Sequence, residues 1–299
     1  KAINFKSVSL NFELAFGVSI SGENGLHARE LIAHAEDALL GVKTGMDPIC
    51  YFNNSSLQHT QQQLARVEHF SDDFLADKIH WYIQPQINIH DKNILGFQLR
   101  GHWYEVPSKR PVELAQFSLL AEYSGEVFFL AKSMFKNAFE TLTCLQKNAC
   151  YKKLSVTLST NALFEPDLVD FIALQIQSSG IAGKYLMVEL CEDAILSDTR
   201  RAKVIIDQLK SLDVSISIIN FSGSYQALRY VRKMAIHQIK LDCQQLTDDA
   251  EHRVDKAITN SLITLTRSMK LPLVGTGIDK HDAVNAFTSL GGTYIQGGI

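Results

Sequence analysis

The stretch IHWYIQPQINIHDKNILGFQLRGHW, residues 79–103, decides the fold. Residues 79–87 and 94–103 are rich in aromatic and β-branched side chains, which is typical of β-strands. The polar residues HDKN lie between them, and so short a connection joins antiparallel neighbours. We therefore expect a β-hairpin at the start of the main domain.

Strand and helix patterns alternate from this hairpin to the end of the chain. The further strand candidates are 153–158, 184–190, 214–219, 236–241, 271–275 and 292–296. The helix candidates are 113–124, 126–147, 161–179, 198–212, 226–233, 250–269 and 280–289. This order predicts an α/β fold, a TIM-like (βα) barrel with an antiparallel first strand. A doubly wound open sheet is the alternative.

The amino-terminal part has a different organisation. Residues 8–20 alternate like a strand, 27–43 carry a helical stripe of apolar residues, and 49–53 are a short strand. We interpret this part as a small α+β fragment of a larger domain, because it is too short to bury much surface alone. A connecting helix is expected at 55–78.

Composition excludes several functional classes. A formal charge of −3 argues against a general nucleic-acid binder, which needs a basic surface. The five cysteines are scattered and form no CxxC pair, which argues against disulfides and structural zinc and for a reducing cytosol. No apolar run reaches the ~18–20 residues of a membrane helix. We predict a cytoplasmic protein, with the cytoplasmic part of a longer membrane-anchored protein as the alternative.

Functional side chains of a barrel gather where its strands end. The predicted strand ends carry few carboxylates, of which Glu189, Asp242 and Asp279 are the main ones. A magnesium site needs several oxygen ligands in one place, so no divalent metal cofactor is expected. Lys240 has two interpretations: an ion pair with Glu189 or Asp242, or a charge stabiliser or imine-forming group.

Eight short motifs, in order, resemble those of the EAL domain, a barrel phosphodiesterase that hydrolyses cyclic di-GMP. They are IQPQI (83–87), GFQLRGHW (96–103), LSVTLS (154–159), LMVELCED (186–193), ISIINFSGSYQAL (216–228), IKLD (239–242), LVGTGIDK (273–280) and YIQGG (294–298). Residues 9–53 similarly resemble the last third of a GGDEF diguanylate cyclase domain. The resemblance implies a tandem with a GGDEF-like part at 1–54, a linker helix at 55–78 and an EAL-like barrel at 79–299.

The sequence departs from the EAL pattern at several positions. Where the family has its signature glutamate, a ligand asparagine, two adjacent aspartates, a further glutamate and a phosphate-contacting arginine, this chain has Gln98, Thr157, Ile219 with Asn220, Thr276 and His102. Glu189, Lys240, Asp242 and Gln296 match the family, and Asp279 conservatively replaces a glutamate. The resemblance thus implies a degenerate member in which the metal pair is not assembled.

The resemblance also implies a set of ligand-binding candidates. They are Gln84, Gln98, His102, Trp103, Glu189, Asn220, Lys240, Asp242, Asp279 and Gln296. No catalytic or metal-ligating residue is predicted.

Three functions remain open from the sequence. The first is a non-catalytic regulatory protein, not an enzyme, that binds a protein partner or an RNA-processing assembly. The second is a cyclic di-GMP receptor that does not hydrolyse its ligand, and the third is a residual phosphodiesterase. A homodimer is also considered, because the segment NFSGSYQ, 220–226, lies where active relatives form dimer contacts.

Overall fold

The computed structural model describes residues 2–5, 8–11, 16–22, 27–28, 31–32, 34–35, 38, 49–52, 70–74, 78–105, 110–244, 246 and 253–298. The chain divides into two compact units, Lys1–Asp72 and Asp73–Ile299. Among the described residues, no helix combines the length and apolarity that crossing a membrane requires.

The first unit contains two small sheets. Strands β1 (Ala2–Phe5) and β2 (Val8–Asn11) pair antiparallel, and β3 (Phe16–Val18) pairs parallel with β4 (Ile49–Tyr51). The predicted strand at 8–20 is thus two strands. Residues 28, 31–32, 34–35 and 38 are helical within the predicted helix 27–43, whose other residues lie outside the described set. Most of the predicted linker helix at 55–78 also lies outside it, and residues 70–74 are helical.

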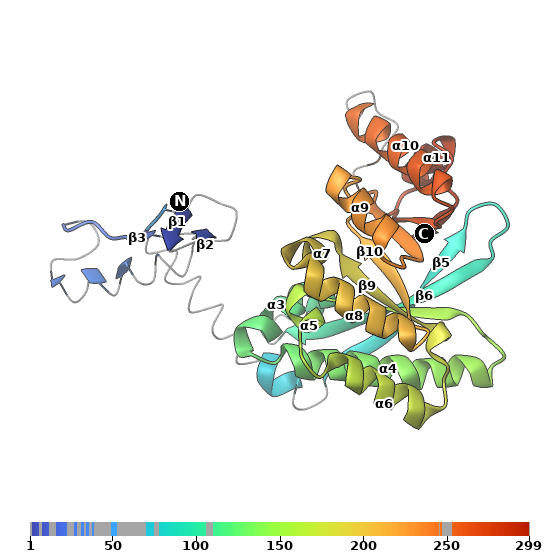
Figure 1. Cartoon of the computed structure of the whole chain (residues 1–299), viewed down its shortest axis with the longest axis horizontal. Helices are drawn as coiled ribbons and strands as arrows, with labels where there is room; N and C mark the ends of the chain where they lie inside the picture. Colours follow the sequence, from blue (N-terminus) through green and yellow to red (C-terminus); the bar gives the residue numbers. More distant parts are fainter. Residues whose placement is uncertain are drawn as a thin grey trace. The chain divides into compact units, whose positions relative to one another are not determined.

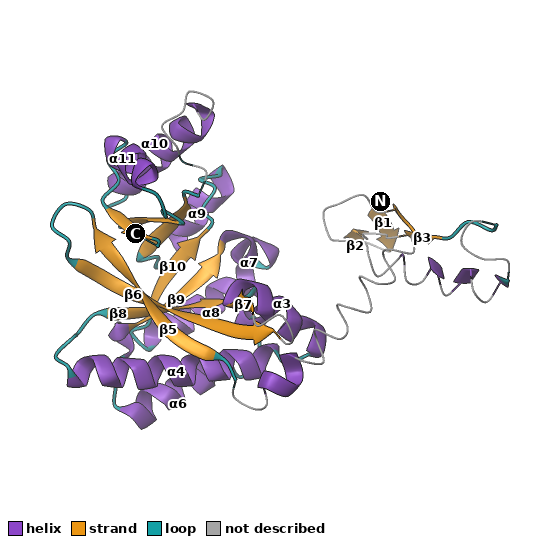
Figure 2. Cartoon of the chain, turned by 180° about the vertical axis from the view of Figure 1, so that it is seen from behind, coloured by secondary structure: helices purple, strands orange, loops and turns teal. Residues whose placement is uncertain are grey.

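The second unit is a closed barrel of eight strands (Figures 1 and 2). The strands, in chain order, are β5 (His80–Asn88), β6 (Ile94–Glu105), β8 (Lys153–Leu158), β9 (Leu186–Cys191), β10 (Ser215–Ile219), β11 (Gln238–Asp242), β12 (Leu273–Thr276) and β13 (Tyr294–Gln296). Strand β5 closes the barrel by pairing antiparallel with both β6 and β13, while the other neighbours pair parallel. The predicted barrel with an antiparallel first strand is confirmed, and the open-sheet alternative is wrong.

Helices cover the outer face of the barrel. They are α3 (Leu114–Ser124), α4 (Val127–Lys147), α5 (Thr160–Leu163), α6 (Leu168–Ser179), α7 (Glu192–Ser197), α8 (Thr199–Ser211), α9 (Tyr225–Lys233), α10 (Arg253–Ser268) and α11 (His281–Ser289), with a 3₁₀ turn η1 (Gly183–Tyr185). Helices α4 and α6 lie side by side in both views (Figures 1 and 2).

Alternation along β8 separates an apolar outer face from a polar inner face. On β8, Leu154, Val156 and Leu158 are at most 2 % exposed and form part of the apolar core. Ser155 and Thr157 alternate with them and face the barrel interior. Thr157 is the register partner of Glu189 on β9, which faces the interior too. Deeper inside, Gln238 donates a hydrogen bond of 2.9 Å from Nε2 to Oε1 of Gln86. The interior therefore presents polar groups along the barrel axis.

Three elements differ from the sequence-based expectation. The predicted helix 161–179 is divided into α5 and α6, because Pro166 lies between them and cannot donate a helical hydrogen bond. A short strand β7 (Arg110–Glu113) extends the sheet by pairing antiparallel with the carboxyl-terminal half of β6. Helix α7 follows β9 directly and was not predicted.

Candidate functional site

A cavity of about 520 Å³ opens at the carboxyl ends of the parallel strands. It lies where barrel proteins place their functional groups. Eight of the ten predicted ligand-binding residues line it: Gln84, Gln98, Glu189, Asn220, Lys240, Asp242, Asp279 and Gln296. The sequence positions that resemble the family's site are therefore brought together, although a role in binding stays a prediction.

Glu189 and Lys240 form an ion pair at the bottom of this cavity. The Lys240 Nζ lies 2.5 Å from Oε1 of Glu189, and the two side chains are 3 % and 0 % exposed. Burial lowers the pKa of Lys240, because an ammonium loses its hydration there, and the negative charge of Glu189 opposes this shift. Of the two interpretations of Lys240, the geometry supports the ion pair.

Neutral groups occupy the other oxygen of Glu189. Gln98 Nε2 donates to Oε2 of Glu189 at 2.8 Å, and the hydroxyl of Thr157 donates to the same oxygen at 2.7 Å. The Gln98 amide also contacts the Thr157 hydroxyl at 2.9 Å. The carboxylate therefore has partners on both oxygens, which a buried charge requires.

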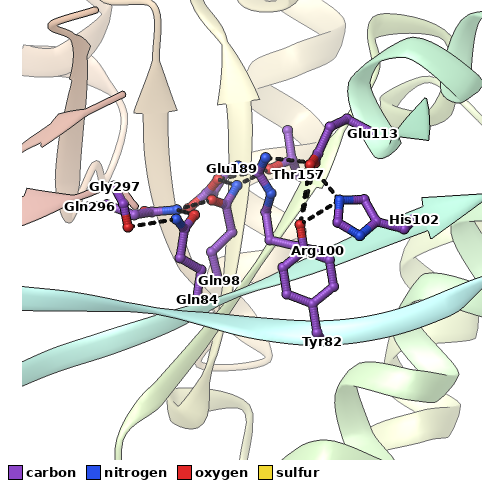
Figure 3. A network of polar contacts seen from close by, with 10 residues as sticks. All are labelled: Tyr82, Gln84, Gln98, Arg100, His102, Glu113, Thr157, Glu189, Gln296 and Gly297. Atoms are coloured by element: carbon purple, nitrogen blue, oxygen red, sulfur yellow. Dashed lines mark hydrogen bonds and ion pairs between the residues drawn. The ribbon is translucent and has the colours of Figure 1, made fainter. Parts of the chain in front are cut away.

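Gln296 connects this group to the first strand of the barrel. Its Oε1 accepts from Lys240 Nζ at 2.9 Å, and its Nε2 donates to Oε1 of Gln84 at 2.8 Å and to Gln98. Gln84 Nε2 in turn donates to the carbonyl oxygen of Gly297 at 3.0 Å. Figure 3 shows Gln84, Gln98 and Gln296 converging from strands that include the first and the last of the barrel.

The acidic residues of the rim are held by the backbone. Asp242 accepts the backbone N–H of Gln244 at 2.9 Å, and Asp279 accepts that of Gly298 at 2.7 Å. Asn220 follows β10 in a left-handed conformation with φ of 55°, which its short polar side chain tolerates. These three residues surround the opening of the cavity rather than its base.

Of the ten candidates, His102 and Trp103 do not line the cavity. The Trp103 side chain is 0 % exposed and its Nε1 donates to Asp73 at 2.9 Å, so it belongs to the core on the other face of β6. His102 lies beside the cavity, where its Nε2 is 2.5 Å from Oε1 of Glu113. The expectation for Trp103 is corrected, because alternation along β6 sends its side chain to the face opposite Gln98 and Arg100. His102 shares the face of Arg100, and its role in binding stays a prediction.

Sequence reasoning missed Arg100 and Glu113, which do line the cavity. Arg100 lies two residues after Gln98 on β6, hence on the same face, and its Nη2 is 2.7 Å from Oε2 of Glu113. Tyr82 donates to Glu113 at 3.4 Å and contacts His102 Nε2 at 3.1 Å. The two-residue period of β6 was the signal that could have identified Arg100.

One wall of the cavity is apolar. Leu114, Val127, Leu130, Ala131 and Met134 come from the start of α3 and the first half of α4. Sequence reasoning assigned these residues to helices and could not place them at the site, since the helix pair reaches the cavity through tertiary packing. The cavity thus combines a polar base with an apolar side.

In the described residues, the carboxylate at the polar base is engaged by other side chains. No three His, Cys, Asp or Glu side chains come together there. Glu189, the buried carboxylate, has its two oxygens occupied by Lys240 and by the Gln98 and Thr157 groups.

The fold and the site define a barrel protein with a cavity of polar base and apolar wall at the carboxyl ends of its parallel strands. The EAL domain model matches residues 67–299, and the chain belongs to this family.

Relatives give the family a context. The chain is 23 % identical over 285 residues to the bifunctional diguanylate cyclase/cyclic di-GMP phosphodiesterase MucR of Pseudomonas aeruginosa, covering 95 % of this chain and 42 % of that protein. It is 25 % identical over 266 residues to the cyclic di-GMP phosphodiesterase NbdA of the same organism, covering 88 % of this chain and 34 % of the relative. The chain thus spans well under half the length of these relatives.

A solved structure supports the fold. The EAL domain of FimX from Pseudomonas aeruginosa, bound to c-di-GMP, superposes with a TM-score of 0.67 at 18 % identity, covering 77 % of this chain and 93 % of that one.

These findings correct three predictions. Relatives are named cyclic di-GMP phosphodiesterases, which contradicts the prediction of a non-catalytic protein acting through a protein or RNA-processing partner. The same names contradict the prediction that the chain is not an enzyme. The prediction of no divalent metal cofactor is contradicted by the family, because EAL phosphodiesterases depend on divalent metal ions.

Proposed function

We propose that the cavity of the barrel binds cyclic di-GMP. The observation that carries this proposal is the convergence of eight family-site positions on one cavity of about 520 Å³. That volume is within the ~300–1,000 Å³ of small-molecule sites. The apolar wall of α3 and α4 suits a purine base, while the polar base and the cations Arg100 and Lys240 suit phosphodiester oxygens.

Calorimetric titration with cyclic di-GMP tests this proposal. We expect saturable one-to-one heat for the protein as it stands. Gln98→Ala removes an amide from the cavity base and should weaken binding by about tenfold, since a lost hydrogen bond costs ~1–1.5 kcal/mol. Gln208→Ala, on the exposed surface of α8, is the matched control. Absence of heat from the unsubstituted protein contradicts the proposal.

The second candidate function is hydrolysis of cyclic di-GMP, which the names of the relatives favour. Opening one phosphodiester bond with one water molecule gives a linear dinucleotide. Chromatography of the titrated sample, with magnesium and with manganese, should reveal this product above a control without protein. Turnover equal to that control contradicts hydrolysis and leaves the binding proposal intact.

We further propose the domain division given by the sequence: a GGDEF-like part at 1–54, a linker helix at 55–78 and the barrel at 79–299. The family match begins at residue 67 and the second compact unit at Asp73, which supports a boundary near the linker. The GGDEF likeness of residues 9–53 and the homodimer stay predictions. An intact-mass and light-scattering measurement decides the oligomeric state.

A further inference from the structure

Four polar side chains form a cluster beside the base of the cavity: Tyr82, Arg100, His102 and Glu113. Three of them direct polar atoms at the one carboxylate of Glu113 (Figure 3). The register explains this convergence, because Tyr82 of β5 is opposite Arg100 of β6, and His102 of β6 is opposite Glu113 of β7. The arrangement is that of an oxyanion-binding site whose anion belongs to the protein.

Partial exposure to solvent sets the strength of the contact between Glu113 and its partners. The Arg100, His102 and Glu113 side chains are 33 %, 26 % and 39 % exposed, so water reaches all three. Burial opposes ionisation of Glu113, but hydrogen bonds and positive charge from His102 and Arg100 hold its pKa below the usual value. An ion pair of this exposure is weak enough to be exchanged for a better anion.

The Glu113 side chain has no role in capping α3. The residue is the N-cap of α3, yet its side chain makes no capping hydrogen bond. Release of the carboxylate from Arg100 therefore costs α3 no side-chain cap.

We infer that Arg100, with His102 and Tyr82, is the phosphodiester-binding site of this chain, and that Glu113 occupies it as an internal competitor until the ligand displaces it. A phosphodiester presents two oxygens to a guanidinium in the same planar geometry as a carboxylate. Arg100 lines the same cavity as Lys240 and Gln98, so the site is continuous with the proposed nucleotide cavity. This inference rests on the proposed binding of cyclic di-GMP.

Calorimetry with cyclic di-GMP on a set of variants tests the inference. Glu113→Gln removes the competing charge and should tighten binding about tenfold. Arg100→Ala should weaken binding about tenfold, and the double variant Glu113→Gln/Arg100→Ala should bind no tighter than Arg100→Ala alone. Glu140→Gln, an exposed carboxylate of α4, changes the total charge equally and should leave the affinity unchanged.

A second substitution guards against loss of fold. Glu113→Ser supplies a favoured N-cap to α3 and removes the same charge, so it should tighten binding as Glu113→Gln does. Melting curves followed by circular dichroism confirm that each variant is folded.

The outcomes separate the two proposals. If the unsubstituted protein binds and both Glu113 variants bind equally or more weakly, the inference is overturned and the cavity proposal stands. If the unsubstituted protein gives no heat, the proposed function fails and the inference fails with it.

Discussion

Glu189 and Lys240 form an ion pair at the centre of the polar contacts inside the barrel. Both side chains are buried, and they satisfy one another together with three neutral groups from other strands, Gln98, Thr157 and Gln296. Removing one partner of such a pair leaves an uncompensated buried charge, whereas replacing both by neutral groups of similar volume removes the cost of desolvation. Substitutions in this ion pair therefore test how the base of the cavity is stabilised.

We predict that Glu189→Gln lowers the free energy of unfolding by about 3–5 kcal/mol, because it leaves Lys240 buried without a counter-charge. The double variant Glu189→Gln/Lys240→Met should recover most of that loss. Urea titrations of both variants measure the difference. A double variant as unstable as the single one would contradict the ion-pair interpretation.

We also predict a pH dependence from His237. Its Nδ1 accepts the backbone N–H of Ile216 at 3.1 Å, which needs a neutral ring, and burial with the positive charges of Lys153 and Lys210 lowers its pKa from 6.5. The unfolded state therefore takes up a proton first as the pH falls, so this contribution is complete above about pH 6.5 and is lost progressively below it. Because His237 is only partly buried, screening by solvent reduces the size of this contribution to stability.

The check on His237 is the slope of unfolding free energy against pH. His237→Gln should reduce the slope between about pH 6.5 and 5, where a histidine with a lowered pKa acts. The exposed His281→Gln is the matched control. Identical slopes for the His237 variant and the unsubstituted protein would refute the assignment.

At this scale the sequence predicted which positions meet but not what each one does. Gln98, Glu189 and Lys240 were placed at strand ends by periodicity, and they do converge. Trp103 was misplaced because a motif was followed across a strand whose neighbouring side chains face opposite ways. Arg100 was overlooked for the same reason, although its two-residue spacing from Gln98 was visible.

At the scale of elements, the connection between α6 and β9 is tightly packed. A Cβ added to Gly183 of η1 would lie 1.9 Å from the backbone carbonyl oxygen of Leu212, where α8 ends. The contact involves a backbone atom, which cannot move away as a flexible side chain does. Gly183 is therefore required by the close approach of two connections.

We predict that Gly183→Ala destabilises the barrel by about 1–3 kcal/mol, the cost of overpacking a close contact. Ala182→Ser, at the neighbouring exposed position, should change stability by less than ~0.5 kcal/mol. Thermal denaturation of the two variants measures the difference. Equal melting temperatures would show that η1 can move aside.

Elements with a long periodic pattern were predicted well. For helix α4 and the barrel strands, the pattern of apolar residues allows only one assignment of secondary structure. The divided helix α5–α6 and the strand β7 were not predicted. The first depends on one proline, and the second is a four-residue strand that depends on pairing with the end of β6. Short elements of this kind are determined by their neighbours more than by their own sequence.

At the scale of the whole molecule, closure by β5 distinguishes this barrel from an open sheet. Closure pairs the first strand with the last, and both neighbours of β5 are antiparallel to it. The alternation of strands and helices predicted a barrel, but the sequence alone left the open sheet available because closure is a contact between distant residues. The register that brings Gln84 to Gln296 is a tertiary property.

We predict that residues 67–299 fold and, under the proposed function, bind cyclic di-GMP with the affinity of the full chain. The family match covers this range, the second compact unit lies within it, and Asp73, the partner of Trp103, is retained. Calorimetry and melting curves of the shortened and full chains provide the comparison. A shortened chain that is folded but binds more weakly would assign part of the site to residues before 67.

The reversed direction of β5 also bears on how this protein can be labelled. Because β5 runs against β6, the turn 89–93 that joins them lies at the end of the barrel opposite the cavity. A fluorescent reporter or an affinity tag inserted in that turn would leave the opening unobstructed, whereas the connections after the parallel strands emerge beside it. The hairpin is thus an attachment point at which a label does not obstruct the cavity.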